Sequence, residues 1–208
     1  IGNNRLKSEK TRQLNIGTAW GGTLGFIDYL NLSIDGYYNR VDDKIIAVPT
    51  MFVWKMSNVG KVKTIGVDVS LNSEISLATD YNLYINATYN YMQAEDISDR
   101  NSKIWKHQIA YTPKHSGSGS MTLEMPWFNI TYNVTYASER YRMAQNSADN
   151  RIAPYSDHSI SFSRLFKWKK QSLRIQADAL NIGNKNYEIV RFYPMPGRNY
   201  KITVTYNI

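Results

Sequence analysis

The sequence has no cysteine among its 208 residues, which excludes disulfides and thiolate metal sites. It also has no run of 18 apolar residues, the minimum for a transmembrane helix. Segments with the helical spacing of apolar residues are scarce. The first six residues, IGNNRL, contain no apolar signal region, so we expect any export signal to lie upstream or to have been removed.

The sequence instead shows strict alternation of apolar and polar residues. In the last nine residues, an apolar residue occupies every second position from Tyr200 to Ile208. Because successive side chains of a strand point to opposite faces, this pattern predicts a strand between two different environments. Nine such segments can be counted, at about 11–20, 26–39, 64–72, 82–91, 105–124, 128–136, 157–166, 172–180 and 200–208. The fifth segment is irregular and is interrupted by Pro113 and by the HSGSGS stretch at 115–120.

The connections between these segments alternate in length. Short ones are expected near 21–25, 77–81, 125–127 and 167–171, and long ones near 43–60, 95–103, 142–154 and 181–198. Outer-membrane barrels have this layout, with short periplasmic turns and longer extracellular loops. Several segments reach the length that a tilted strand needs to cross a bilayer, and Tyr and Trp recur near their ends, as in an interfacial aromatic girdle. The fold class expected is therefore all-β, a transmembrane antiparallel β-barrel.

A soluble β-sandwich that binds a cell-surface ligand is the alternative, because its strands also alternate. Sandwich strands are usually shorter, about 5–6 residues. An odd number of strands cannot close an ordinary bacterial barrel, and an open sheet would leave backbone groups unpaired in lipid. We therefore expect residues 1–208 to form the C-terminal part of a longer barrel.

Short motifs along the chain point to one family. Near the C-terminus, Ala179–Tyr187 is similar to the pattern N-L-F-D-K-x-Y, and it is followed by P-G-R and a closing strand. The matching residues are Asn181, Lys185, Tyr187, Pro196, Gly197 and Arg198, and the departures are Gly183, Asn184 and Ile208. Weaker matches occur upstream in the same order, at Leu6–Glu9 with Asn15–Gly17, Tyr38–Arg40 with Asp43–Ile45, and Asn58–Gly60 with Gly66–Asp68. As an ordered set, these motifs resemble those of the TonB-dependent outer-membrane receptors.

The resemblance implies a 22-stranded barrel with a plugged lumen, of which this chain supplies about nine strands. It implies location in the Gram-negative outer membrane and TonB-dependent uptake of a scarce nutrient such as a cobalamin, a siderophore or haem. A passive outer-membrane channel is the alternative. The expected partners are the lipid bilayer and lipopolysaccharide, the plug domain, the upstream barrel strands and the TonB complex, reached through the missing N-terminal region. A surface lipoprotein lid is a further candidate.

No catalytic constellation is visible, so the chain is not expected to be an enzyme or to hold a cofactor. His107, His115 and His158 are isolated, without metal-ligand spacing. The acidic residues Glu95, Asp96 and Asp99 lack the dense oxygen spacing of a calcium loop. The net charge of +8 is spread along the chain, and no aromatic RNA-binding motif accompanies it, so a nucleic-acid partner is not expected.

Candidate ligand-contacting residues lie in the expected outer loops, where aromatic, cationic and soft apolar side chains could contact a nutrient by stacking and charge. They are Met51, Phe52 and Trp54, with Met56 beside them, in the first long loop; Tyr141 and Arg142, followed by Met143, in the third; and Tyr187, Arg191, Phe192 and Tyr193 in the last. Packing against a neighbouring loop or a lid protein is the alternative for the first group. Arg198 is expected to be structural, because the chain must turn sharply there into the final strand.

Overall fold

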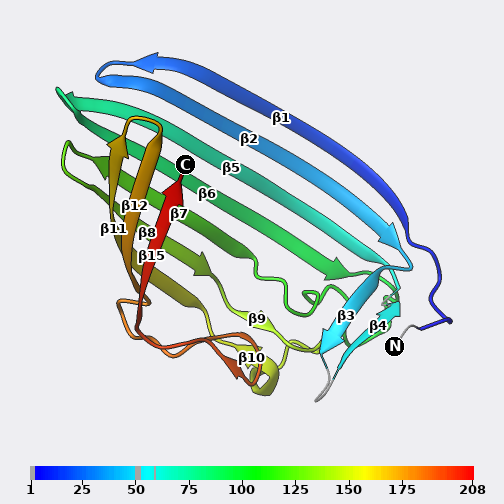
Figure 1. Ribbon diagram of the computed structural model, residues 1–208. Helices are drawn as coiled ribbons and strands as arrows, with labels where there is room; N and C mark the ends of the chain where they lie inside the picture. Colours follow the sequence, from blue (N-terminus) through cyan, green and yellow to red (C-terminus); the bar gives the residue numbers. More distant parts are fainter. Residues whose placement is uncertain (1–2, 50–52, 59) are drawn as a thin grey trace.

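The computed structural model describes residues 3–49, 53–58 and 60–208. Nine long strands form one curved antiparallel sheet (Figure 1). Their order in the sheet follows the chain, so that each strand pairs with its sequence neighbours. The strands are β1 Lys10–Leu24, β2 Ile27–Asp42, β5 Val62–Ala78, β6 Tyr81–Asp96, β7 His115–Glu124, β8 Asn129–Ala137, β11 Tyr155–Trp168, β12 Gln171–Leu180 and β15 Asn199–Asn207.

The remaining elements lie in the long connections, as three two-stranded ribbons and one short 3-10 helix. They are β3 Ile45–Pro49 with β4 Trp54–Asn58, β9 Arg140–Tyr141 with β10 Arg151–Ile152, β13 Glu188–Val190 with β14 Tyr193–Pro194, and η1 Ala148–Asn150. Tight turns join the nine strands at one end of the sheet, and the long connections lie at the other (Figure 1). This arrangement confirms the expected alternation. We call the end with the long connections the outer end.

Within the described residues, no helix has the length and hydropathy needed to span a bilayer.

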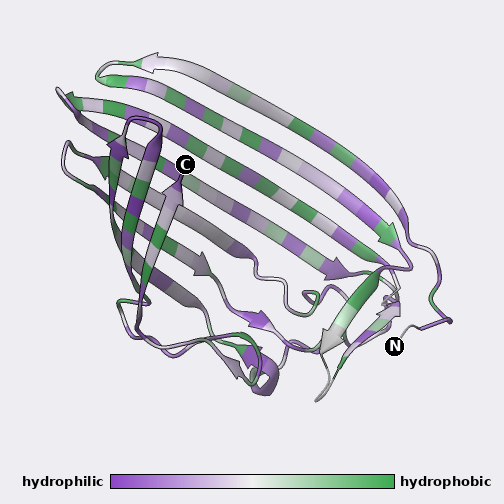
Figure 2. Ribbon diagram, in the orientation of Figure 1, coloured by the Kyte–Doolittle hydropathy of each residue, from purple (hydrophilic) through white to green (hydrophobic). Residues whose placement is uncertain are grey.

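The apolar residues of the strands face away from the protein on one side of the sheet. Figure 2 shows the alternating hydrophobic and hydrophilic positions along the strands. Leu14 and Ile16 in β1 and Ile202 in β15 are 69%, 78% and 76% exposed. In a water-soluble sandwich, side chains of this kind would be packed between two sheets. The soluble sandwich alternative is therefore wrong: one sheet presents its apolar face outward.

The opposite face of the sheet is polar and is linked by hydrogen bonds between neighbouring strands. The Thr88 and Ser118 hydroxyls are 2.8 Å apart, and Thr122 and Thr131 are joined in the same way at 2.9 Å. Cross-strand pairs of this kind stabilise a sheet by a fraction of a kcal/mol each, about 0.2–1. This face is the one that would line the lumen of a closed barrel.

A small apolar cluster lies at the outer end of the sheet. Val62, Ala94 and Ile109 are its buried members, and Ile46 and Met92 pack against it. Ile109 belongs to the connection between β6 and β7, so the cluster holds this loop against the strands. The other buried apolar residues among those described are scattered and do not form an extended core; they are Val41, Ile75, Ala137 and Ile152.

The fifth segment differs from the sequence prediction in its bounds. The strand is β7, His115–Glu124, and residues 97–114 form the loop before it. The HSGSGS stretch does not interrupt the strand but begins it. A Cβ atom at Gly117 would lie 2.6 Å from the Thr88 carbonyl oxygen. Glycine is therefore used here for close approach between strands, which composition alone cannot distinguish from a loop.

The first turn also differs from its prediction. Gly21 and Gly22 lie inside β1, and the tight turn is formed by Gly25 and Phe26. Gly25 has a φ of +58°, a conformation that residues with a Cβ adopt rarely. The two strands on either side are therefore longer than the alternation indicated.

Candidate ligand-binding site in the outer loops

Three of the long connections meet at the outer end of the sheet. They are the loops at 97–114, 138–154 and 181–198, after β6, β8 and β12. The Tyr111 backbone N–H donates to the Tyr141 carbonyl at 2.7 Å, which joins the first two. Burial raises the pKa of the Tyr111 phenol, and a hydrogen bond with the Arg191 backbone opposes this shift. Tyr111 therefore contacts both of the other loops.

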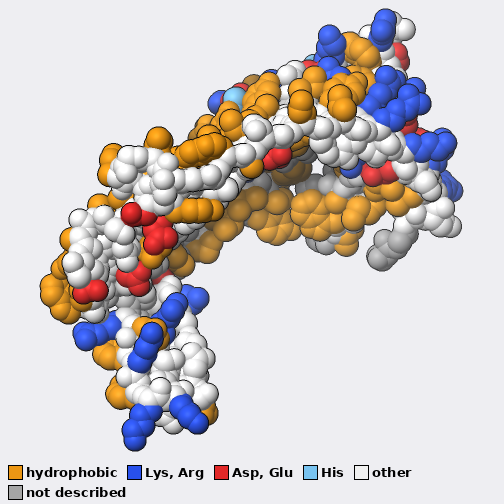
Figure 3. Space-filling model, turned by 90° about the horizontal axis from the view of Figure 1, so that it is seen from above, with side chains coloured by type: hydrophobic (Ala, Val, Ile, Leu, Met, Phe, Trp, Pro, Cys, Tyr) orange, Lys and Arg blue, Asp and Glu red, His pale blue; other side chains and the backbone are white. Residues whose placement is uncertain are grey.

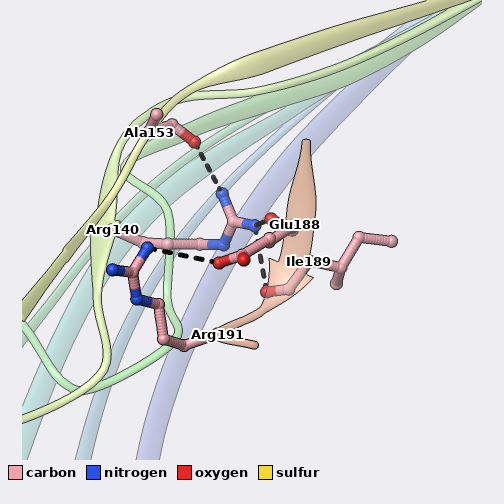
Figure 4. Close-up of polar contacts among 5 residues, drawn as sticks. All are labelled: Arg140, Ala153, Glu188, Ile189 and Arg191. Atoms are coloured by element: carbon pink, nitrogen blue, oxygen red, sulfur yellow. Dashed lines mark hydrogen bonds and ion pairs between the residues drawn. The ribbon is translucent and has the colours of Figure 1, made fainter. Parts of the chain in front are cut away.

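Arg140 in β9 ties the second of these loops to the third. Its side chain is buried, with the residue 3% exposed, and its guanidinium donates to the carbonyl oxygens of Glu188 at 2.5 Å and Ile189 at 3.0 Å. The guanidinium also donates a longer hydrogen bond to the Ala153 carbonyl, at 3.5 Å (Figure 4). Burial lowers the pKa of Arg140, but an arginine remains charged at neutral pH. Charged donors to backbone carbonyls are among the stronger hydrogen bonds.

Two other arginines lie against one phenylalanine ring nearby. The Arg142 guanidinium carbon is 5.7 Å from the centre of the Phe192 ring, and that of Arg191 is 5.2 Å from it. Arg191 also pairs with Glu188 at 3.4 Å. The Arg142 Nε atom is buried and has no hydrogen-bond partner among the described residues. We call Arg142, Arg191 and Phe192 the arginine–phenylalanine cluster.

Phe192 occupies the turn of the β13–β14 ribbon in an unusual conformation. Its φ is 69°, in the left-handed region that a bulky side chain rarely adopts. The side chain is 70% exposed, and that of Tyr193 is 61% exposed. Exposed aromatics beside guanidinium groups can contact a ligand by stacking, and the cations can bind a negative charge. Strained residues of this kind are frequent in ligand-binding sites.

Tyr187 is placed differently from the other three candidates of the last loop. Its ring stacks on Tyr155 with 4.5 Å between centres, and its hydroxyl donates to the Asp157 carboxylate at 2.5 Å. Burial and this carboxylate raise the pKa of Tyr187. The three residues line a cavity of about 400 Å³ together with Asn181 and Met195. Tyr187 thus belongs to this cavity, on the polar face of the sheet.

The P-G-R motif and its preceding asparagine build the base of the last loop. Asn181 is buried, and its amide donates to the carbonyls of Lys185 at 2.9 Å and Pro196 at 3.0 Å. Arg198 donates to the Ile182 carbonyl at 2.7 Å. These contacts agree with the structural role expected for Arg198. The Asn181 and Arg198 side chains both bond backbone groups of the same loop, which gives a reason for their joint occurrence.

Only part of the first-loop candidate group lies within the described residues. Met51 and Phe52 are outside the described residues. Trp54 is in β4, 54% exposed, on the ribbon that follows β2. Tyr141 contributes a backbone contact between two of the loops: its carbonyl accepts a hydrogen bond from the Tyr111 backbone N–H. Arg140 was not predicted from sequence, because an arginine in a loop is ordinarily solvated and nothing local indicates burial.

Glu95, Asp96 and His115, for which the sequence predicts no metal-binding role, are engaged in local contacts. Glu95 pairs with Lys63 at 3.3 Å, Asp96 accepts from the Ser98 backbone at 2.8 Å, and His115 Nδ1 lies 2.7 Å from the Tyr89 hydroxyl. Across residues 3–49, 53–58 and 60–208, no group of three or more His, Cys, Asp or Glu side chains is arranged to hold a metal ion.

The chain is similar in structure to parts of several solved receptors and transporters. It matches the ferric citrate transporter FecA with a TM-score of 0.70 and 17% identity, over 96% of this chain and 31% of that one. It matches the copper transporter OprC with a TM-score of 0.68 and 18% identity, over 97% and 32%. It matches BauA, the ferric preacinetobactin receptor from Acinetobacter baumannii, with a TM-score of 0.65 and 16% identity, over 95% and 29%. This chain therefore spans less than a third of each of these proteins.

The sequence also matches a family directly. The family described as TonB dependent receptor-like, beta-barrel, covers residues 1–182. Its members are transporters of the Gram-negative outer membrane rather than enzymes. The match is independent of the P-G-R motif and the closing strand, which lie beyond it. The chain belongs to the barrel domain of the TonB-dependent receptors.

Proposed function

We propose that this chain is the C-terminal part of the barrel of an outer-membrane receptor that imports a metal complex by TonB-dependent active transport. Family membership supports uptake driven by TonB. The similar structures carry names of ferric siderophore, ferric citrate and copper transporters. An iron or copper complex is therefore a better-supported cargo than cobalamin, and haem is a second iron-containing candidate for the same assay.

The arginine–phenylalanine cluster carries this proposal. Two guanidinium groups lie within 5.7 Å of an exposed ring at the outer end of the sheet. Only one of them, Arg191, has an ion pair among the described residues. The remaining positive charge favours a ligand that is negative overall, such as a ferric complex of carboxylates or catecholates, whose flat groups can also stack on Phe192.

The proposed receptor works with parts beyond this chain. A plug domain would contact the polar face of the sheet, upstream strands would pair with the free edges of β1 and β15, and TonB would act on the plug. Trp54 and its exposed neighbour Met56 would meet either the nutrient or a surface lipoprotein lid. Residues 1–208 would be one barrel segment with no separate domain boundary.

Ligand binding by the complete receptor tests the proposal. The purified protein is titrated with ferric citrate, a ferric catecholate, haem and cobalamin, and tryptophan fluorescence reports the dissociation constants. An Arg142→Gln and Arg191→Gln double variant should bind the preferred ferric complex at least tenfold more weakly, since hydrogen bonds to charged groups contribute about 1.5–3 kcal/mol each. Arg151→Gln, in an exposed pair with Glu139, is the control and should bind normally.

Uptake in cells separates active import from a passive channel. The preferred complex should accumulate only when the TonB complex is present and the inner membrane is energised. Accumulation that continues without TonB would contradict the proposal and support the channel. Equal ligand affinity of the double variant and the native protein would show that the arginine–phenylalanine cluster is not part of the binding site.

A further inference from the structure

The cavity beside Tyr187 shares no lining residue with the arginine–phenylalanine cluster. It lies on the polar face of the sheet, where Thr135 in β8 is directly opposite Asp157 in β11 and Asn133 is directly opposite Ser159. All four of these strand residues line the cavity. Apolar side chains line the convex edge of the molecule in Figure 3, so the polar face with its cavity is the concave one.

The lining of this cavity carries very little charge. Among the described residues that line it, Asp157 is the one charged side chain, and no Lys, Arg or His takes part. One oxygen of the Asp157 carboxylate accepts a hydrogen bond from the Tyr187 hydroxyl. A negative ligand would meet this carboxylate without any compensating cation. The cavity is therefore unsuited to the negative metal complex proposed for the arginine–phenylalanine cluster.

Several polar side chains of the cavity have hydrogen-bonding capacity to spare. Within the parts of the chain that the structure describes, the Asn133 amide and the Thr135 and Ser159 hydroxyls bond to no other residue. Amides and hydroxyls can both donate and accept. The stacked rings of Tyr155 and Tyr187 form an aromatic part of the wall. The apolar residues of the lining are Leu180, Ile189, Met195 and Pro196.

A second, smaller hollow continues the cavity along the polar face. It has a volume of about 180 Å³ and shares Asn133 and Thr135 with the cavity. Ser120 in β7 is directly opposite Asn86 in β6 and Asn133 in β8, so a small side chain lies between two amides. The described residues that line this hollow are all uncharged. Together, the cavity and the hollow form one track of hydroxyl and amide groups across β6, β7, β8 and β11.

We propose that the cavity binds a neutral saccharide, with one sugar ring in the cavity and further units along the hollow. A sugar ring is uncharged, its hydroxyls donate and accept hydrogen bonds at its rim, and its C–H faces are apolar. These properties match a wall of aromatic and apolar side chains with a few polar groups. The cavity volume of about 400 Å³ is within the range of small-molecule sites, about 300–1,000 Å³. Asp157 and Asn133 would bond the ring hydroxyls.

Calorimetric titration of the complete purified receptor, in a detergent without a sugar headgroup, tests this site. The probes are glucose, maltotriose, glucuronate and choline. Glucuronate has the ring of glucose with an added negative charge, and choline is a cation without a sugar ring. We expect maltotriose to bind more tightly than glucose, because its further units reach the hollow. Glucuronate should bind roughly fivefold more weakly than glucose or worse, because it meets the Asp157 carboxylate.

Two variants test the residues that would bond the sugar. Asp157→Asn and Asn133→Ala should each weaken maltotriose binding roughly tenfold. Asparagine at position 157 can still accept from Tyr187, which keeps this part of the wall in place. Asp157→Asn should also bind glucuronate more tightly than the native protein does, a gain that misfolding cannot produce. Asp80→Asn, an exposed residue of the tight turn between β5 and β6, is the matched control and should bind maltotriose normally.

The saccharide could reach the cavity as a free sugar or as a glycosyl group of the imported complex. A saturating amount of the preferred ferric complex separates these sources. Maltotriose should bind beside the complex if the sugar is free, and it should compete with the complex if the sugar is part of it.

The outcome is distinguishable from that of the proposed function, because Arg142→Gln with Arg191→Gln should leave maltotriose binding unchanged. Absence of binding by both glucose and maltotriose would overturn the saccharide site. So would binding of choline in place of the sugars, or an unchanged affinity for maltotriose in both Asp157→Asn and Asn133→Ala.

Discussion

The buried guanidinium of Arg140 donates to the Glu188 carbonyl at 2.5 Å, across 48 residues of sequence. This contact fixes two outer loops relative to each other and places Arg142 and Phe192 within cation–π distance. The proposed ligand-contacting surface therefore depends on Arg140, a residue that is itself buried. Its role is to position the loops, since its donors are used by backbone carbonyls.

Replacement of Arg140 by methionine should loosen both loops while leaving the barrel folded. The carbonyls of Glu188 and Ile189 would lose a charged donor, at a cost of about 1.5–3 kcal/mol. Hydrogen exchange in residues 138–154 and 181–198 should become faster. Arg151→Met, which removes an exposed pair with Glu139 at 2.6 Å, should change exchange little. Unchanged exchange in the Arg140 variant would show that the two loops are held by other contacts.

Asn181→Asp tests the base of the last loop with almost no change in shape. The amide nitrogen of Asn181 donates to two carbonyls, and a carboxylate oxygen in its place would face both without a proton. We expect a loss of about 1–3 kcal/mol or more in unfolding free energy, measured by thermal unfolding. Asn186→Asp changes an exposed residue of the same loop and serves as the control. Equal melting temperatures for the two variants would be evidence that the Asn181 hydrogen bonds do not stabilise the last loop.

Replacement by alanine should have different effects on stability at two glycines of the sheet. At Gly117 the added Cβ would meet the Thr88 carbonyl at 2.6 Å, whereas at Gly36 the nearest atom is Ile16 Cγ2 at 3.7 Å. Gly117→Ala should therefore destabilise the barrel by about 1–3 kcal/mol, as overpacking does. Gly36→Ala should be tolerated. Folding yield into lipid vesicles measures both, and a tolerated Gly117→Ala would mean that the strands can separate there at little cost.

The strands and their faces could be predicted from the sequence because they depend on local alternation. Ile34 and Ser33 point to opposite faces wherever the strand lies. The loops could not be predicted in this way. Burial of Arg140 results from carbonyl groups 48 and 49 residues away, and nothing near Arg140 in the sequence indicates them.

The same distinction explains two differences between the interpretation of the sequence and the structure. Glycine in the HSGSGS stretch was interpreted as an interruption, although Gly117 is needed for close contact with a neighbouring strand. Tyr187 was grouped with Arg191 and Phe192 because they are adjacent in sequence, whereas its hydroxyl is engaged by Asp157. In both cases, a partner from another strand determines the role of the residue.

Acid should weaken the contact between the segment before β1 and the β3–β4 ribbon. The Ile45 backbone N–H donates to the Glu9 carboxylate at 2.5 Å, and this bond, helped by Lys44, lowers the pKa of Glu9. A lowered folded-state pKa means that the stabilisation is complete above the ordinary value of 4.5 and is lost as the pH falls through the folded-state value. The protection factor of the Ile45 amide, its exchange rate compared with the intrinsic chemical rate at the same pH, should therefore fall at acid pH.

Glu9→Gln provides the matching control for this titration. The variant should show fast exchange at Ile45 even at neutral pH, and its exchange should no longer change at acid pH beyond the intrinsic chemical rate. If protection of the Ile45 amide in Glu9→Gln still depended on pH, a group other than Glu9 would be responsible for the titration.

The most direct test of the account compares arginine at neighbouring positions of β2 in the complete barrel. Ile34 faces outward opposite Thr18 and Val69, and Ser33 faces the lumen opposite Ala19 and Ser70. Reversible folding into lipid vesicles gives the unfolding free energy. Ile34→Arg should cost about 2–4 kcal/mol and Ser33→Arg less than half of that, with the same order for Val134→Arg and Asn133→Arg. Equal costs on the two faces would contradict the assignment of the apolar face to lipid.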